Sequence, residues 1–325
     1  MSRVLGLAAA ACALLAVPAV VGPFQVTLFS QAFVWGILGL GVWLLLRISY
    51  LASFGHAAFF GVGAYIGGLA VVRWDVDNVF AALGAGVAAG CVVALPIALV
   101  AARLSGISFL LITLAYAEML RALAGRWDVL GGTDGLVGVT RPDAAPLPLE
   151  LAEPTTFYYF AFAVLACVLL VMFAIVKSPV GGALVGIRES EDRMAALGYN
   201  AVAYRLFAFL ASAAAAATAG VLNAYLNRFV DPGDVSALVS AKALLIVVIG
   251  GAPIVGPPVA AIALTQLEEL LSSHSERWLG LLGAIYVLVA LVAPGPGRFG
   301  ALWGRARHAL AGWGRRRTRT AEGGT

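Results

Sequence analysis

Long apolar stretches recur along the whole sequence and constrain its fold more than any other feature. Several approach or exceed 18 residues with almost no charge, which is enough for a helix to cross roughly 30 Å of hydrocarbon. The chain is 62% hydrophobic and only 12% charged, whereas soluble domains carry about 25% charged residues. The alternation of a transmembrane β-barrel is absent. The sequence therefore predicts an all-α polytopic membrane protein.

Ten segments have the composition of membrane helices, some of them short or re-entrant and rich in Gly. They are 4–22, 28–46, 52–72, 79–102, 107–123, 156–176, 206–226, 238–250, 254–271 and 278–293. Segment 4–22 fits a signal peptide or a retained helix, and its length favours a retained helix. For 238–271, Gly250–Pro253 and Gly256–Pro258 predict a turn between two short spans, with a single kinked helix as the alternative.

Residues 1–297 are predicted to form one membrane domain, followed by a basic, Gly-rich and disordered tail at 298–325. Within the domain, 178–205 is the densest run of charge. Arg188–Arg193 alone holds two arginines, two glutamates and one aspartate. Because apolar spans flank it, this stretch must lie in water. We expect a short helix that is presented to a partner; an ordinary solvated loop is the alternative.

The distribution of basic residues predicts which side of the membrane this stretch faces. With 178–205 in the cytoplasm and ten spans, 14 lysines and arginines fall on the cytoplasmic side and 6 outside, while Lys242 lies within a span. This bias agrees with the positive-inside rule. Both termini are then cytoplasmic and the 125–155 loop is extracytoplasmic. Membrane topology also accounts for the net charge of +4, so no nucleic-acid partner is expected.

We expect the helix of the charged stretch to offer a small, flat face for docking. On this helix, Glu189 and Arg193 are spaced to pair. A small-residue face with charged edges suits a groove on another protein. The face comprises Ile187, Glu191, Met194, Ala195 and Gly198.

The motifs of common enzyme classes are missing from the sequence. There is no G-x-x-x-x-G-K-[ST], so no P-loop ATPase site is expected, and no H-E-x-x-H or G-x-S-x-G occurs. We expect no catalytic residue, no metal site and no cofactor bound by this chain. The three cysteines, Cys12, Cys91 and Cys167, are predicted to be buried and inert.

The run Ser53–Tyr65 is unusually dense in small residues for a membrane span. Gly63 and Gly67 have the G-x-x-x-G spacing that lets helix backbones approach closely in lipid. Such a run serves helix contact alone, or it forms a broken helix that lines a translocation path. In the second case His56, Gly61 and Gly63 are the candidates, although His56 fits a structural histidine equally well.

Polar residues inside later spans are further candidates for a path. Thr113, Tyr116 and Glu118 make 107–123 more polar than its neighbours, but Glu118 can also pair locally with Arg121. Asn223 near the outer end of 206–226 has the same two interpretations. An ion-coupled carrier usually keeps several carboxylates within its spans. Their scarcity here favours an external energy source over a self-contained channel or secondary carrier, and the charged stretch would be the place to receive that energy.

Four ordered motifs resemble permease subunits of bacterial branched-chain amino acid ABC transporters. They are SFGHAAFFGVGAY (53–65), GGTDGL (131–136), GIRESEDRMAALG (186–198) and VVIGGAPIVGPPVAA (247–261). The resemblance covers about residues 30–295, and the long outer loop favours the LivM-like branch. Departures occur at Ala252-Pro253, at Pro258 and at Tyr116-Ala117, where the family has other residues.

The resemblance implies an ABC importer permease of the bacterial cytoplasmic membrane. Its implied partners are a second, LivH-like permease, two cytoplasmic ATPases that use ATP, and an extracytoplasmic solute-binding protein. The solute would be a branched-chain amino acid or a related small solute such as urea or a short amide. The residues implied to contact the ATPase are Arg188, Glu189, Glu191, Ala195 and Gly198.

Overall fold

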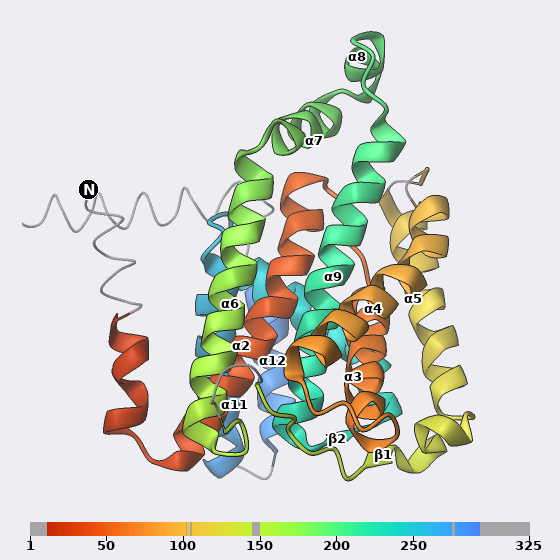
Figure 1. Ribbon diagram of the computed structural model, residues 1–325. Helices are drawn as coiled ribbons and strands as arrows, with labels where there is room; N and C mark the ends of the chain where they lie inside the picture. The colour runs from red at the N-terminus through yellow and green to blue at the C-terminus, as the bar shows by residue number, and fades with distance from the viewer. Residues whose placement is uncertain (1–11, 102, 105, 145–149, 275–276, 293–325) are drawn as a thin grey trace, which may run out of the picture.

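The computed structural model describes residues 12–101, 103–104, 106–144, 150–274 and 277–292, and the protein is a bundle of helices (Figure 1). The first half contains α2 (Pro23–Trp43), the π-helical η1 (Leu44–Ile48), α3 (His56–Val72), α4 (Val79–Ala101), α5 (Gly106–Ala124) and α6 (Pro154–Lys177). The second half contains α7 (Pro179–Glu189), α8 (Glu191–Ala196), α9 (Ala201–Asn227), α10 (Ala237–Gly250), α11 (Gly256–His274) and α12 (Trp278–Val292).

Five helices are long and apolar enough to cross a membrane: Pro23–Ile48, Val79–Val100, Gly106–Ala124, Pro154–Lys177 and Ala201–Asn227. They confirm five of the predicted segments. The predicted segments 52–72 and 238–250 are shorter apolar helices of 17 and 14 residues. Residues 12–20 are helical, but the rest of segment 4–22 and the tail at 298–325 lie outside the described residues. The total of ten spans stays a prediction.

Local sequence explains where the helices around the charged stretch begin and end. Pro154 stands in the first turn of α6, where its missing N–H is not needed. Ser178 accepts from the backbone N–H of Gly181 and starts α7, and Asn200 accepts from that of Ala203 and starts α9. Arg228 ends α9 with a positive φ of 55°.

Helix α9 lies in the middle of the bundle and packs against α2, α3 and α4. The contact with α3 is so close that glycine is required on both sides. A Cβ atom at Gly63 would overlap the backbone of Ala217, and one at Gly220 would overlap that of Phe60. The small-residue run of α3 therefore provides close helix contact, as one of its two predicted interpretations requires.

Two breaks in the chain let short helices begin inside the bundle. Residues 49–55 are non-helical and lead from η1 into α3, and residues 228–236 lead from α9 into α10 through β2 (Phe229–Val230) and the 3-10 helix η4 (Pro232–Val235). The starts of α3 and α10 meet, because the Ser240 hydroxyl donates to Phe54 O at 2.6 Å and accepts from Ala57 N at 2.9 Å. This contact satisfies backbone groups that would otherwise be unpaired in the interior.

Helices α10 and α11 are separate, as the Gly- and Pro-rich sequence predicts. Gly251 ends α10 with a φ of +73°, a conformation that glycine adopts without strain. Its carbonyl accepts from the indole N–H of Trp43 at 3.3 Å, which ties the turn to the end of α2. The alternative of one kinked helix through this region is thereby ruled out.

Candidate functional site

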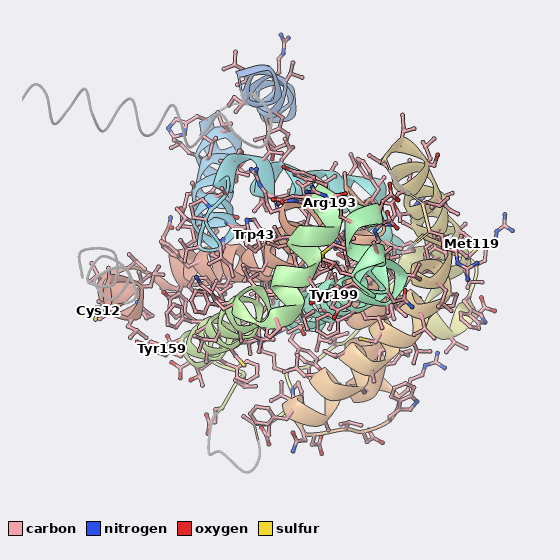
Figure 2. All side chains as sticks on the ribbon, turned by 90° about the horizontal axis from the view of Figure 1, so that it is seen from above. Cys12, Trp43, Met119, Tyr159, Arg193 and Tyr199 are labelled. Atoms are coloured by element: carbon pink, nitrogen blue, oxygen red, sulfur yellow. The ribbon has the colours of Figure 1, made fainter. Side chains whose placement is uncertain are left out.

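The charged stretch forms two helices that project from one end of the bundle (Figure 1). Helix α7 ends at Glu189, because Ser190 is extended, with φ −162° and ψ 100°, and α8 then begins. Figure 2 looks down on this projecting pair from above, with Arg193 and Tyr199 labelled. We call residues 179–199 the α7–α8 hairpin.

The docking face was predicted on one helix, and the structure does not form it. The break at Ser190 turns α8 relative to α7, so Ile187 is buried at 4% exposure while Ala195 is exposed. Met194 folds back over Gly186, where its sulfur leaves no room for a side chain. The predicted Glu189–Arg193 pair is also wrong, because Glu189 lies 3.8 Å from Arg188 instead.

Arg188 faces the bundle. Its Nη1 donates to Arg47 O at 2.8 Å, and its guanidinium lies 4.6 Å from the ring centroid of Tyr50. Tyr50 has a positive φ of 53°, which is strained for a residue with a side chain. The hairpin is thus fixed to η1 and to the non-helical segment that precedes α3.

The exposed part of the hairpin is its tip. Glu191 is bound to Arg205 of α9 at 2.7 Å, which fixes the start of α8. Gly198 is exposed and has a φ of +88°. Beside it, Leu197 is 72% exposed, an apolar side chain that sequence periodicity did not single out.

His56 is buried where α3 begins. Its Nε2 lies 2.6 Å from the Ser212 hydroxyl, and that hydroxyl donates to Gly41 O at 2.7 Å. On its other side, Nδ1 of the same ring lies 3.3 Å from Ser53 O. The ring therefore joins α3 to α9 and α2. This geometry is that of a structural histidine, and a role in a path stays a prediction.

Three more predicted path residues also contact other elements of the bundle. Thr113 accepts from Phe54 N at 3.2 Å, and Tyr116 donates to Val93 O of α4 at 2.6 Å. A Cβ atom at Gly61 would overlap the Val235 side chain. Thr113 thus holds the break before α3, Tyr116 joins α5 to α4, and Gly61 leaves room for η4. A part of these three residues in a path stays a prediction.

Glu118 belongs to a polar cluster at the end of the bundle opposite the hairpin. It pairs with Arg121 at 2.6 Å, as its spacing predicts, and its other oxygen accepts from Ala237 N at 3.3 Å. The carboxylate thus satisfies the first N–H of α10 and opposes the positive end of that helix.

Asn223 joins the same cluster through η4. It donates to Asp234 at 3.1 Å, and Asp234 accepts from Asp231 N at 3.3 Å. Burial raises the pKa of Asp234 to about 6, and the nearby charge of Asp231 adds to the rise. Neither aspartate was singled out from the sequence, because they lie in a polar turn that does not look different from any other.

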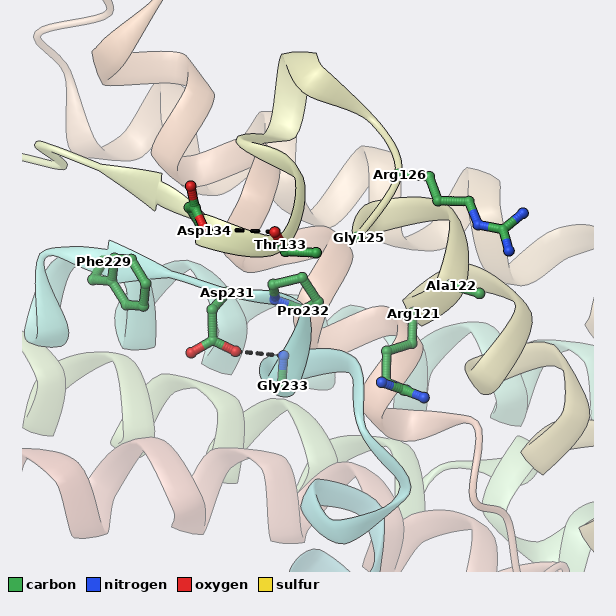
Figure 3. A pocket seen from close by; sticks show the side chains of 10 residues that line it. All are labelled: Arg121, Ala122, Gly125, Arg126, Thr133, Asp134, Phe229, Asp231, Pro232 and Gly233. Atoms are coloured by element: carbon green, nitrogen blue, oxygen red, sulfur yellow. Dashed lines mark hydrogen bonds between the residues drawn. The ribbon is translucent and has the colours of Figure 1, made fainter.

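A pocket of about 550 Å³ opens at this end between α5 and η4 (Figure 3). It lies beside the 125–135 turns, where Gly131, Gly132 and Gly135 all have positive φ. The lining residues are Arg121, Ala122, Gly125, Arg126, Thr133, Asp134, Phe229, Asp231, Pro232 and Gly233.

All three cysteines are free, but Cys12 and Cys167 are exposed on the outside of the bundle, so the prediction that they are buried is wrong for both. Among the described residues, no three His, Cys, Asp or Glu side chains are grouped to hold a metal ion.

Comparison with known proteins identifies the fold's family. Residues 24–291 match the family described as branched-chain amino acid transport system / permease component. The chain belongs to this permease family. It is 28% identical over 316 residues to the high-affinity branched-chain amino acid transport system permease protein LivM of Salmonella typhimurium and to that of Escherichia coli. The aligned region covers 86% of this chain and 72% of each relative. No solved structure matches.

Membership of the permease family confirms the resemblance inferred from the four motifs. It makes the chain an all-α polytopic transport component, in agreement with the five long apolar helices. The motif at 186–198 lies in the α7–α8 hairpin, and the motif at 53–65 spans the end of the break before α3 and the first part of α3 itself.

Proposed function

We propose that this chain is the permease subunit of an ATP-binding-cassette importer for branched-chain amino acids. The observation that carries the proposal is the α7–α8 hairpin, which leaves the bundle and exposes small and apolar residues at its tip. Partner ATPases would dock on this tip. The names of the two LivM relatives support branched-chain amino acids over urea or short amides as the solute.

The hairpin is attached in a way that suits a mechanical coupling. Arg188 contacts Arg47 O and the Tyr50 ring, and residues 49–55 continue directly into the break before α3. A displacement of α7 would therefore reach the start of α3 through the seven residues 49–55. Of the residues expected to contact the ATPase, Glu189, Ala195 and Gly198 stay available at the surface. Glu191 is exposed as well, but it is paired with Arg205, and Arg188 would act from within the permease.

A substitution on the exposed face of α8 tests the docking. Ala195→Arg adds bulk and charge at an exposed helical position, whereas Gly198→Arg would also strain a backbone with positive φ. In proteoliposomes that hold both permeases, the ATPases and the binding protein, we expect Ala195→Arg to reduce ATP-dependent leucine uptake about tenfold or more. Ala203→Arg, also exposed but on the first turn of α9, is the matched control.

The same preparation separates an ABC importer from a self-contained channel or ion-coupled carrier. Under the proposed function, leucine uptake requires ATP and the permease co-purifies with its ATPases. Uptake by this chain alone, driven by a proton or sodium gradient, would overturn the proposal. An Ala195→Arg variant that transports normally would reject the docking surface but leave the transport function standing.

A further inference from the structure

The pocket at the end opposite the hairpin has walls of opposite charge. Arg121 and Arg126 stand on the α5 side, while Asp134 and Asp231 stand on the side formed by the 131–135 turn and η4 (Figure 3). Phe229 and Pro232 add apolar surface to the lining. A volume of about 550 Å³ is within the usual range for a small-molecule site.

The charges on the two walls do not neutralise each other. In the part of the chain that the structure describes, no ion pair joins an arginine of one wall to an aspartate of the other. Arg121 instead pairs through Nε with Glu118 at 2.6 Å, which leaves its two terminal nitrogens as donors. The Asp231 carboxylate caps η4, where it accepts from Gly233 N through Oδ1 and from Asp234 N, and its remaining lone pairs can still accept from a ligand.

This arrangement has the charge pattern that a free amino acid requires. An amino acid carries a carboxylate and an ammonium group on neighbouring carbon atoms, together with its side chain. A guanidinium binds a carboxylate through charge-assisted hydrogen bonds, and a carboxylate binds an ammonium group in the same way. The apolar surface of Phe229 and Pro232 suits an aliphatic side chain.

We propose that this pocket binds a zwitterionic α-amino acid with an aliphatic side chain. Arg121 holds the carboxylate of the ligand, and Asp231 holds its ammonium group. The inference rests on the proposed function, since it identifies where the permease receives its solute. A pocket of this kind rejects urea and short amides, which carry neither charge.

Two single substitutions test the two charges separately. Arg121→Gln removes the cation, and Asp231→Asn removes the anion while its remaining oxygen can still accept from Gly233 N. Arg73→Gln and Asp75→Asn are matched controls, because both residues are exposed at the same end and lie outside the pocket.

Binding is measured by saturation-transfer NMR on the complete permease and ATPase complex in nanodiscs, without the binding protein. The probes are leucine, 4-methylpentanoate, which lacks the ammonium group, and 3-methylbutylamine, which lacks the carboxylate. We expect leucine to bind and each variant to weaken it about tenfold, as for the loss of a charged hydrogen-bond partner. Arg121→Gln should leave the binding of 3-methylbutylamine unchanged, and Asp231→Asn should leave that of 4-methylpentanoate unchanged.

The effects of the two variants on the three probes decide the inference. If wild-type complex does not bind leucine, or if both variants weaken all three probes equally, the zwitterion site is rejected. Variants that keep leucine binding but lose capture of the leucine-loaded binding protein would make the pocket a protein-docking site and overturn the inference. ATP-dependent uptake in the same preparation shows independently whether the proposed function stands.

Discussion

Lys242 of α10 is a charge placed inside the bundle, and its surroundings explain how it is tolerated. Its Nζ lies 2.6 Å from a Glu268 oxygen and 4.1 Å from the centroid of the Trp35 ring, and Tyr286 donates to the other Glu268 oxygen at 2.8 Å. Both charged side chains are only 19% exposed. Lys242→Met should destabilise the protein by about 3 kcal/mol, because it leaves the Glu268 carboxylate without its cation.

Thermal unfolding of the purified permease in detergent checks this expectation. The double variant Lys242→Met with Glu268→Gln removes both charges and keeps an acceptor for Tyr286, so it should recover most of the lost stability. A double variant as unstable as the single one would show that the ion pair is not what matters at Lys242.

Asp234 predicts a pH dependence of stability. Its pKa rises from 3.8 to about 6 on folding, so between these values the folded protein holds a proton that the unfolded chain has released. Stability should therefore fall as pH rises from about 4 to about 6, by roughly 2–3 kcal/mol, and this contribution should stay constant above that range. Melting temperatures measured across this range should show a shallower decline for Asp234→Asn. An identical slope in both proteins would contradict the assignment.

Among single residues, the sequence predicted side-chain pairs within one helix but not pairs between helices that are far apart in the chain. Glu118 and Arg121 pair as their spacing requires. Lys242 and Glu268, or His56 and Ser212, meet only because the helices pack, and no periodicity relates them. Arg188 was expected at a partner surface. It turned inward because Arg47 O and the Tyr50 ring offered partners within the chain.

The contact between α3 and α9 depends on glycine at defined positions. Gly63→Ala should destabilise the permease by about 1–3 kcal/mol, because the new Cβ atom would overlap the Ala217 backbone and force the helices apart. Gly84→Ala on α4 is the control. Nothing lies within 4 Å of a Cβ atom there, so the change should be neutral or stabilising by up to about 1 kcal/mol.

Thermal unfolding of the two variants gives the comparison directly. Equal melting temperatures for Gly63→Ala and Gly84→Ala would mean that the close approach of α3 and α9 is not needed. An apolar side chain larger than alanine at Gly63 should lower the yield of folded protein further, because the overlap is with backbone atoms that cannot rotate away.

The ends of helices could be predicted where an apolar stretch stops at Gly or Pro residues. They could not be predicted where the break has no such residue. The Gly- and Pro-rich turn before α11 lies where the sequence predicts it. The continuous helix expected over 187–198 was wrong, because extended backbone at Ser190 lets Met194 cover Gly186 and Ile187 bury itself. Helical spacing alone carries no information on such a turn, since every residue from Glu191 to Ala196 is acceptable in a helix.

For the whole molecule, the count of basic residues predicts which end of the bundle faces which side of the membrane. The hairpin and the 131–135 turn lie at opposite ends of the bundle (Figure 1). Six basic residues are expected on the side of the 131–135 turn and 14 on that of the hairpin. From these numbers the positive-inside rule predicts that the hairpin lies in the cytoplasm and the pocket between α5 and η4 outside.

Cysteine labelling tests this orientation in cells. In a variant whose Cys12, Cys91 and Cys167 are replaced by alanine, Thr133→Cys and Ala195→Cys each add one exposed thiol, at the turn and at the hairpin. A membrane-impermeant maleimide should label Thr133→Cys in intact spheroplasts and Ala195→Cys only after the membrane is opened. The opposite order would place the hairpin outside, where no ATP is available, and would remove the physical basis for coupling through it.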